Sequence, residues 1–430
     1  MASARGGTLT SVSPDAGVMK QGVPMSTVQL DDGFPPFAFD YLLAGDIRDP
    51  YPALAEAREA TPVRSMPNPF DPSAPPNYLV YRHADVVRLF KDNVTFSSSI
   101  LRESMGPAMG DQIILGMDEP EHRRHRGLVS TAFRQRALSR WEESLVGEVC
   151  NRLIDGFADR GEADLVPDFT WQFPPQVIAG ILGLPQEDFR QFQRWAIAIT
   201  GLHTDFERGM AASAELKHYL ARILVERRRA PSDDVISDLA VAELDGEHLD
   251  DEEIFSFLRL LLPAGVETTF RSSGNLLMLL LTHPEQLEAV RADRSLLPQA
   301  IEEGLRFEPP LLLTGRIATR DAELSGVTIP AGASVAPMLG AANRDPRAFT
   351  DPDRFDIFRD PSQHVSFAHG VHVCLGMHLA RLETRVAVDA LIDRLPNLRL
   401  DEERAAREDA HIHGEIFRSP TALPVRWDPA

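Results

Sequence analysis

The stretch SFAHGVHVCLGMHLARLE, residues 366–383, decides the fold of this chain. It contains Cys374, one of only two cysteines among 430 residues, with Gly370 and Gly376 on either side. Glycine permits positive φ angles and lets the backbone approach a partner closely. A helical pattern begins directly after the cysteine, so the sulfur lies at the N-terminus of a predicted helix. Free N–H groups and the helix dipole favour a thiolate at that position.

Three chemistries are open to such a thiolate. A nucleophile needs a base, and His369, His372 and His378 are close in sequence, which keeps a cysteine hydrolase among the hypotheses. Zinc would need a second cysteine or a histidine pair at ligand spacing. The other thiol, Cys150, is far away beside an apolar helical face, a pattern typical of a buried, inert cysteine. A lone thiolate also suits a metal whose remaining ligands come from a macrocycle, as in haem held by one cysteine.

Composition indicates one large globular domain. The chain is 43% hydrophobic and 25% charged, and no linker-like stretch or internal repeat divides it. We expect a flexible segment at residues 1–35 and a single domain at residues 36–430. The N-terminus lacks an apolar signal sequence, and charged residues and a proline interrupt the apolar region 255–281. The sequence predicts a soluble, cytoplasmic protein without a membrane anchor, and its net charge of −20 disfavours nucleic acid as a partner.

Helical periodicity dominates the chain, and strand patterns are short and few. The predicted helices include residues 141–157, 185–229, 250–282, 284–292, 297–307 and 375–395. Strands are predicted at residues 77–82, at residues 323–339 as a pair around a Pro-Ala-Gly turn, and at residues 416–427 as a C-terminal hairpin. The fold class is therefore mainly α with minor β.

The pattern Phe367-x-x-Gly370-x-His372-x-Cys374-x-Gly376 resembles the haem-binding signature of the cytochrome P-450 monooxygenases. Three further motifs appear in the family's order, so the resemblance covers nearly the whole chain after residue 35. It implies the single-domain cytochrome P-450 fold, a triangular helical prism with haem b between a long central helix and the cysteine loop. It also implies that Cys374 is the axial ligand of the haem iron and that Phe367, His372 and Gly376 contact the cofactor.

The segment PAGVET, which begins at Pro263, resembles the central-helix signature of that family. Pro263 removes a helical hydrogen bond and bends a helix, and Gly265 costs about 1 kcal/mol in a helix interior. Acid and hydroxyl groups beside such a break indicate a functional site. The resemblance implies that Ala264 and Gly265 contact the haem, and that Glu267 and Thr268 are catalytic residues that relay protons. The alternative is that Thr268 only bonds a helix carbonyl at the kink.

The pair Glu303-x-x-Arg306 lies on one face of a predicted helix, where acid and guanidinium can pair. In isolation this is a common surface pair. The resemblance implies the family's Glu-x-x-Arg motif, completed by Arg354 in the later segment DPDRFD. These three residues are expected to be structural and to stiffen the core behind the haem.

The motif His122-x-x-x-Arg126 presents two cationic side chains on one helix face. The resemblance implies that this pair holds one haem propionate, and that Arg316 and His372 hold the other. Guanidinium and imidazolium groups are suitable partners for carboxylates. The alternative is a surface pair without a ligand.

The resemblance also implies a substrate pocket built from several separate segments. Its predicted substrate-binding residues are Ile113, Ile114, Leu311, Leu312, Leu313 and Phe417. A mostly apolar pocket orients a lipophilic molecule by shape, such as a terpenoid, a fatty acyl chain or a steroid. Arg102 or Arg418 could meet a substrate carboxylate, but a surface arginine is the preferred interpretation of each.

The implied reaction is the insertion of one oxygen atom of O2 into a substrate C–H bond, most simply a hydroxylation. The chain has no room for a fused flavin domain, so we expect electrons from NAD(P)H to arrive through a ferredoxin reductase and a ferredoxin. An acidic ferredoxin could dock on the basic segment 121–140, whose alternative interpretation is a solvated helix face. The rival hypotheses are a peroxide-driven haem-thiolate enzyme and a non-catalytic haem protein that senses or carries a ligand.

Overall fold

The computed structural model describes residues 46–68, 74–133, 135–200, 205–360 and 363–428. The predicted flexible segment at residues 1–35, and the beginning of the predicted domain, lie outside the described residues. Within the described part, helices dominate and the strands are short, as the sequence predicts. The elements that place the candidate site are α5, α12, α14, α16 and the sheet strand β7.

The helices in chain order are α2 (Tyr51–Ala60), α3 (His83–Lys91), α4 (Ser99–Met109), α5 (Glu121–Val129), α6 (Gln135–Trp141), α7 (Gly147–Asp155), α8 (Phe173–Ile181), α9 (Phe189–Thr200), α10 (Phe206–Arg229), α11 (Val235–Ala240), α12 (Asp251–Thr282), α13 (Pro284–Ala292), α14 (Leu297–Phe307), α15 (Leu339–Ala342), α16 (Met377–Arg394) and α17 (Glu402–Glu408).

The strands are β1 (Val63–Met66), β2 (Asn77–Val80), β3 (Phe96–Ser97), β4 (Glu162–Asp164), β5 (Glu243–Leu244), β6 (Glu247–His248), β7 (Arg316–Ala318), β8 (Ala322–Leu324), β9 (Val327–Ile329), β10 (Ser334–Pro337), β11 (Arg399–Leu400), β12 (Ile412–His413), β13 (Ser419–Pro420) and β14 (Pro424–Arg426).

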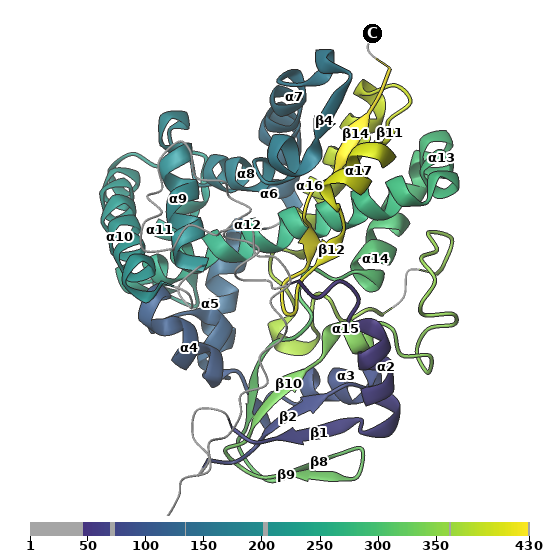
Figure 1. Cartoon of the computed structure of the whole chain (residues 1–430). Coiled ribbons are helices and arrows are strands. Elements are labelled where there is room, and N and C mark those ends of the chain that lie inside the picture. The colour runs from purple at the N-terminus through teal and green to yellow at the C-terminus, as the bar shows by residue number, and fades with distance from the viewer. Residues whose placement is uncertain (1–45, 69–73, 134, 201–204, 361–362, 429–430) are drawn as a thin grey trace, which may run out of the picture. The chain divides into compact units, whose positions relative to one another are not determined.

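Helix α12 is the long central helix, and it matches the helix predicted at residues 250–282. It begins with a capping box in which Asp250 and Glu253 each accept from the other's backbone N–H. The helix continues through Pro263, and most of its side chains are buried. It packs against β13 and against α8, α14 and α16, and these three helices lie around it in Figure 1. Burial on several faces explains why this segment is apolar almost throughout.

Helix α16 follows the cysteine loop and matches the helix predicted at residues 375–395. Gly376 is its N-cap, and no side chain caps the helix there. The helix packs against α7, α12 and α14, so the residues before it are held at the end of a firmly packed element. This placement fixes the position of the cysteine loop relative to α12.

The largest sheet has five strands in the order β1-β2-β10-β7-β3. Strand β10 runs parallel to β2 and antiparallel to β7. The buried side chains of Val80, Leu89 and Val335 belong to one apolar cluster, which packs α3 onto this sheet. Strand β7 carries Arg316, so the sheet positions one of the predicted cofactor residues.

Two strand predictions need correction. The region 323–339 forms three strands, because β8 and β9 make their own hairpin whereas β10 joins the large sheet. At the C-terminus, β13 pairs with β12, and β14 pairs with β4 and β11 instead of with β13. In both places a tertiary partner outcompetes the nearest strand in sequence.

Candidate functional site

The loop before Cys374 is shaped by glycine. Gly370 has a φ angle of +73°, and a Cβ atom there would lie 2.5 Å from the carbonyl oxygen of Phe90. Only glycine fits this combination of backbone angle and close approach. The N–H of Cys374 donates to the carbonyl of Phe367 at 2.9 Å and closes the loop. The cysteine is therefore presented by a backbone with little freedom.

The Cys374 side chain is exposed, yet protein atoms surround its sulfur closely. Desolvation raises the pKa of this thiol above its ordinary value, although the N–H groups of Gly376 and Met377 and the guanidinium groups of Arg126 and Arg381 lower it. The helix N-terminus thus supplies the predicted donors, but they do not outweigh desolvation in the free thiol. A bound metal cation would displace the proton and use the same donors to stabilise the thiolate.

Four cationic or potentially cationic side chains converge from three segments. His122 and Arg126 come from α5, Arg316 from β7 and His372 from the cysteine loop. The rings of His122 and His372 lie 4.1 Å apart between centroids. Burial, together with the neighbouring His122 and Arg316, lowers the pKa of His372 to about 3. Burial also lowers the pKa of Arg316 to about 10.

Several polar atoms of this cluster lack hydrogen-bond partners in the described protein, and the nearest acid to His122 is Glu119, whose carboxylate lies 3.7 Å from Nδ1. Among the residues that the structure describes, neither ring nitrogen of His122 has a hydrogen-bond partner, and the same holds for Nε2 of His372. Buried polar groups without partners are rare in native proteins and call for an explanation. An anion would satisfy these nitrogens and offset the repulsion among the four groups. Haem presents two propionate carboxylates, which suit these cationic side chains, and an iron ion, which suits the Cys374 thiolate. The residues present therefore fit haem.

Helix α12 contributes Ala264 and Gly265, but in different ways. Ala264 is exposed, whereas Gly265 is partly buried. A Cβ atom on Gly265 would lie 2.6 Å from Cδ1 of Ile178 in α8. Gly265 therefore lets α8 approach α12. This packing role accounts for the glycine without the cofactor contact that the sequence predicts.

Thr268 and Glu267 have separate partners. The Thr268 hydroxyl donates to the carbonyl of Ala264 at 2.9 Å, which is the contact expected if the threonine only bonds a helix carbonyl. Glu267 is buried, and Nε of Arg271 donates to its Oε1 at 2.9 Å. Sequence reasoning missed Arg271, although an acid and an arginine four residues apart on a helix are a recognised pairing.

Comparison with known proteins agrees with this geometry. A family model described as Cytochrome P450 matches residues 176–404. The chain is 38% identical over 390 residues to the vitamin D(3) 25-hydroxylase of Pseudonocardia autotrophica. The aligned region covers 88% of this chain and 95% of that protein. This chain belongs to the cytochrome P450 family.

Other relatives of this P450 agree. The cytochrome P450 monooxygenase PikC of Streptomyces venezuelae is 37% identical over 388 residues, covering 88% of this chain and 91% of that protein. The structure of CYP109E1 from Bacillus megaterium in complex with testosterone matches with a TM-score of 0.79 and 32% identity, covering 88% of this chain and 98% of that one.

Family membership confirms the predicted P450 fold and the predicted monooxygenase activity. P450 enzymes use haem iron, O2 and electrons that redox partners supply. The hydrolase hypothesis for Cys374 is therefore wrong. Within the described residues, no helix combines the length and the apolar character needed to cross a membrane.

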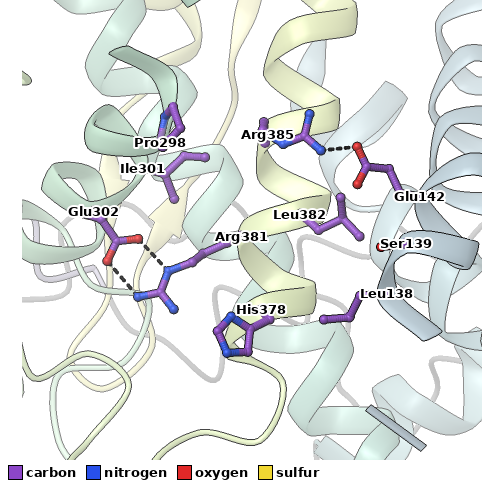
Figure 2. Close-up of a pocket in the computed structure, with 10 residues that line it drawn as sticks. All are labelled: Leu138, Ser139, Glu142, Pro298, Ile301, Glu302, His378, Arg381, Leu382 and Arg385. Carbon is purple, nitrogen blue, oxygen red and sulfur yellow. Dashed lines mark hydrogen bonds and ion pairs between the residues drawn. The ribbon is translucent and has the colours of Figure 1, made fainter. Parts of the chain in front are cut away.

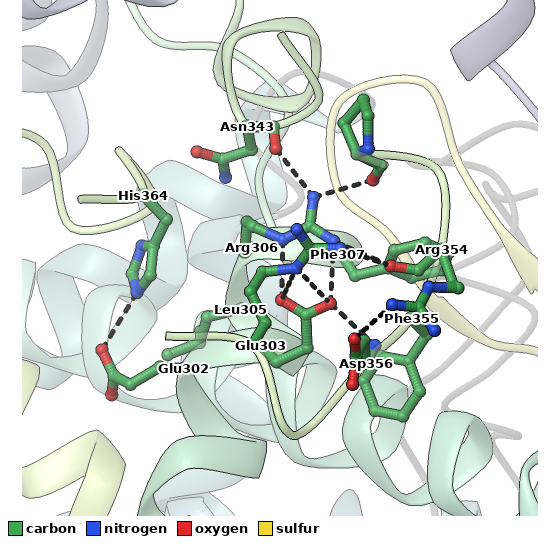
Figure 3. Close-up of polar contacts among 12 residues, drawn as sticks. Glu302, Glu303, Leu305, Arg306, Phe307, Asn343, Arg354, Phe355, Asp356 and His364 are labelled. Carbon is green, nitrogen blue, oxygen red and sulfur yellow. Dashed lines mark hydrogen bonds and ion pairs between the residues drawn. The ribbon is translucent and has the colours of Figure 1, made fainter. Parts of the chain in front are cut away.

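The predicted Glu303–Arg306 pair is present and buried. Nε and Nη2 of Arg306 donate to the two carboxylate oxygens of Glu303 at 2.7 and 2.8 Å. Nη1 of Arg306 donates to the carbonyls of Asn343 and Pro352 at 2.9 and 2.8 Å, and Figure 3 shows these bonds converging on one guanidinium. The pair therefore ties α14 to the segment that precedes the cysteine loop.

Arg354 does not complete this network as predicted. Its side chain is 66% exposed and pairs with Asp356, as Figure 3 shows. Arg359 takes the expected place, since its Nε lies 3.4 Å from the Glu303 carboxylate. Arg354 contributes only its carbonyl, which accepts from Arg306 at 3.2 Å. The path of the loop decides which of the two arginines points inward.

The predicted pocket residues do not all face one way. Leu312 is 2% exposed, and its side chain packs against Gly340, where an added Cβ atom would lie 2.5 Å from the leucine. Its neighbours form backbone bridges to other segments, Leu311 with Phe417 and Leu313 with Met338. Leu312 therefore belongs to the core, as expected for the middle residue of an extended segment.

The remaining predicted pocket residues Ile113 and Ile114 lie just before and within the turn that precedes α5, and Ile113 is completely buried. Arg418, predicted as a surface arginine, is only 1% exposed. It pairs with the buried carboxylate of Glu308. Arg102 pairs with Glu121 at 2.9 Å and is partly exposed. Neither guanidinium is left over for a substrate carboxylate.

The basic segment 121–140 is less available than its sequence indicates. Arg124 donates to Glu253 at 2.6 Å and to the carbonyl of His248 at 2.9 Å, so it joins α5 to the start of α12. Arg140 pairs with Asp233. Arg123 is 81% exposed and lies 3.1 Å from Glu119. Arg134 is outside the described residues.

A surface cavity of about 280 Å³ lies between α6, α14 and α16. Figure 2 shows its lining, which combines apolar side chains with the ion pairs Glu302–Arg381 and Glu142–Arg385. His378, one helical turn after Cys374, also lines it. The cavity contains neither Cys374 nor the cationic cluster, so it is distinct from the candidate haem site.

Proposed function

We propose that this P450 binds haem b through Cys374 and through its two propionates, and hydroxylates a lipophilic substrate. The observation that carries the proposal is the group of unpartnered, buried imidazole nitrogens of His122 and His372 beside Arg126 and Arg316. In this proposal one propionate lies against His122 and Arg126, and the other against Arg316 and His372. Phe367 and Gly376 belong to the loop that surrounds the metal ligand.

When bound, thiolate-ligated haem iron supplies the O2 activation and the oxidising power of the reaction. The protein's residues hold and protect that chemistry. Cys374 gives up its proton, and the N–H groups of Gly376 and Met377 stabilise the resulting charge. Thr268 carries a proton on Oγ1, which donates to the carbonyl of Ala264, and Glu267 is the buried carboxyl group proposed to exchange protons.

The substrate in this proposal is a steroid-like, terpenoid or fatty acyl molecule. Support comes from relatives whose names contain vitamin D(3) and testosterone, both lipophilic molecules. The side chains proposed to contact the substrate are Ile114, Leu311, Leu313 and Phe417, whereas Ile113 is completely buried and belongs with Leu312 to the core. Since the proposed contacts are apolar, shape would orient the substrate more than polar contacts would.

Electrons in this proposal come from NAD(P)H through a ferredoxin reductase and a ferredoxin. The ferredoxin would dock near α5 and the start of α16, where Arg123 is 81% exposed and His378 lines the surface cavity. Arg124 is unsuitable as a docking residue because it is engaged with Glu253. Charge reversal at Arg123 should slow ferredoxin-driven turnover and weaken its salt dependence.

A peroxide-driven reaction is the second candidate. It is favoured by one observation: Thr268 bonds Ala264, and Glu267 is held by Arg271, so the acid and the hydroxyl are not directly bonded to each other. An enzyme that takes both oxygen and protons from peroxide does not need that pair. Product formation with hydrogen peroxide alone, equal to that with ferredoxin and reductase, would favour this candidate.

The test of the main proposal is the absorption spectrum of the reduced protein under carbon monoxide. A strongly red-shifted Soret band is expected, and Cys374→Ala should lose it. Titration with vitamin D3 and testosterone should then reveal low-to-high-spin shifts for pocket ligands. Haem without the shifted band would contradict the thiolate role of Cys374. If His122→Phe and His372→Phe both retained haem as well as the wild type, the propionate assignment would be contradicted.

A further inference from the structure

Arg271 is a buried arginine that the reaction as proposed leaves without a task. It lies in α12 one helical turn after Glu267, and it is 0% exposed. Its Nε donates to Oε1 of Glu267 at 2.9 Å, and Nη2 donates to the same oxygen. Its Nη1 donates to the hydroxyl of Ser419 in β13 at 2.8 Å. The guanidinium thus bonds the proposed proton-relay acid on one side and the β12–β13 hairpin on the other.

The guanidinium also packs between two aromatic rings. Its central carbon lies 4.8 Å from the ring centre of Phe270 and 5.3 Å from that of Phe417. Phe417 is a proposed substrate contact in the turn between β12 and β13, two residues before Ser419 of β13. Leu311, another proposed substrate contact, forms a bridge with Phe417 on its other side. The same turn therefore contacts both the pocket and Arg271.

We infer that Arg271 is a positioning residue that couples occupation of the substrate pocket at Phe417 to the orientation of the Glu267 carboxylate. This inference rests on the proposed function. The guanidinium is planar and rigid, so displacement of the Phe417–Ser419 turn moves all of its donors together. In a buried, low-dielectric site such a movement changes the strength of the bonds to Glu267. Substrate binding would thereby set when the acid exchanges protons.

A purely structural ion pair is the competing explanation. Arg344 supplies a matched control, because it is also buried between two aromatic rings and beside an acid. Its central carbon lies 3.4 Å from the ring centre of Tyr51 and 3.8 Å from that of Phe307. Its Nη2 lies 3.7 Å from Glu308. Between described residues, Arg344 contacts neither Glu267 nor Phe417, and its partner Glu308 also pairs with Arg418. Arg344→Gln therefore reports the loss of a buried guanidinium that does not touch the Glu267 carboxylate.

The test uses clotrimazole, an azole that binds P450 iron and fills the pocket with apolar arms. Its dissociation constant is measured by spectral titration of the haem-loaded wild type, Glu267→Gln, Arg271→Gln, the double variant and Arg344→Gln. Coupling through Arg271 predicts that Glu267→Gln changes the dissociation constant by about threefold or more, and that this change disappears in the Arg271→Gln background. If the double variant changed the dissociation constant by the product of the two single fold-changes, the inference would be overturned.

Two conservative variants keep the test decisive if a glutamine variant fails to fold. Arg271→Lys keeps the charge but cannot bond Glu267 and Ser419 in the same planar geometry. Ser419→Ala removes the hydroxyl that accepts from Nη1 of Arg271. Both should raise the fraction of NADPH electrons that end as hydrogen peroxide by about twofold or more, with melting temperatures close to that of the wild type. Unchanged peroxide yields in both variants would contradict the inference.

The inference and the proposed function fail in different ways. A wild-type protein without the red-shifted carbon monoxide band would remove the proposed function. The proposed function would stand if the wild type had this band and turned over NADPH, while Arg271→Gln and Arg344→Gln changed the peroxide yield equally. In that case Arg271 would be structural only.

Discussion

Two buried clusters of charged residues in this P450 differ in whether their bonds are complete. In the Glu303–Arg306 network, both carboxylate oxygens accept from the guanidinium and the remaining donors reach backbone carbonyls. In the cationic cluster, the ring nitrogens of His122 and Nε2 of His372 have no hydrogen-bond partner among the described residues, and the carboxylate nearest to His122 Nδ1, that of Glu119, is 3.7 Å away. Both clusters contain arginine, so composition alone does not separate them.

The difference shows what each cluster is for. A buried network whose polar groups are all satisfied within the protein stabilises one arrangement of segments. A buried cluster that lacks partners destabilises the protein by itself and is retained where a ligand completes it. We therefore expect substitutions in the first cluster to act on folding, and substitutions in the second to act on haem retention.

The largest effect should come from Arg306→Ala. It leaves the Glu303 carboxylate buried with fewer donors and removes the bonds to Asn343 and Pro352, so the free energy of unfolding should fall by about 3–5 kcal/mol. Urea unfolding of the purified protein measures this loss. A decrease below about 1 kcal/mol would mean that the network is not structural and would remove the contrast.

The next effect concerns haem retention by the cationic cluster. His372→Phe should speed haem loss about tenfold or more, because it removes the proposed charge-assisted bond to a propionate. The unfolding free energy of the haem-free protein should stay the same or rise, since a buried imidazole without a full set of partners is removed. Haem transfer to apomyoglobin and urea unfolding give the two readouts. A large loss of apoprotein stability with normal haem retention would reverse the assignment.

A smaller effect separates two arginines of one loop. Arg359→Ala should lower the unfolding free energy by about 1–3 kcal/mol, since its guanidinium reaches Glu303 and the carbonyl of Asp351. Arg354→Ala is the matched control and should change it by less than about 0.5 kcal/mol, because its side chain is mostly exposed. Equal losses in both variants would restore Arg354 to the network.

The smallest effect is a pH dependence beside the same network. Burial raises the pKa of Glu302, but hydrogen bonds from Arg381 and His364 lower it to about 2 overall. Its stabilisation is therefore present above the ordinary glutamate pKa of about 4.5 and is lost as the pH falls from there toward 2. Glu302→Gln should make the pH dependence of unfolding shallower in that window, by about 1 kcal/mol in total. An unchanged slope between pH 4.5 and 3 would contradict this assignment.

The sequence by itself determined the features that depend on local spacing. The helix after Cys374, the glycine at position 370 and the Glu303-x-x-Arg306 pair each follow from residues a few positions apart, whose geometry a helix or a tight turn fixes. The central helix α12 was equally predictable, because its apolar pattern is long. These motifs also identified the family, which the similarity to known P450 enzymes confirms.

Only the tertiary structure decided which distant side chains meet. It placed Arg359 instead of Arg354 at Glu303, and it showed that Gly265 makes room for Ile178. It also joined Arg271 to Ser419, 148 positions later in the chain. The physical reason is that a side chain's partner across the core depends on how whole helices and loops pack. Residue type and local spacing do not contain that packing, so a motif can name the chemistry of a site without naming every contact in it.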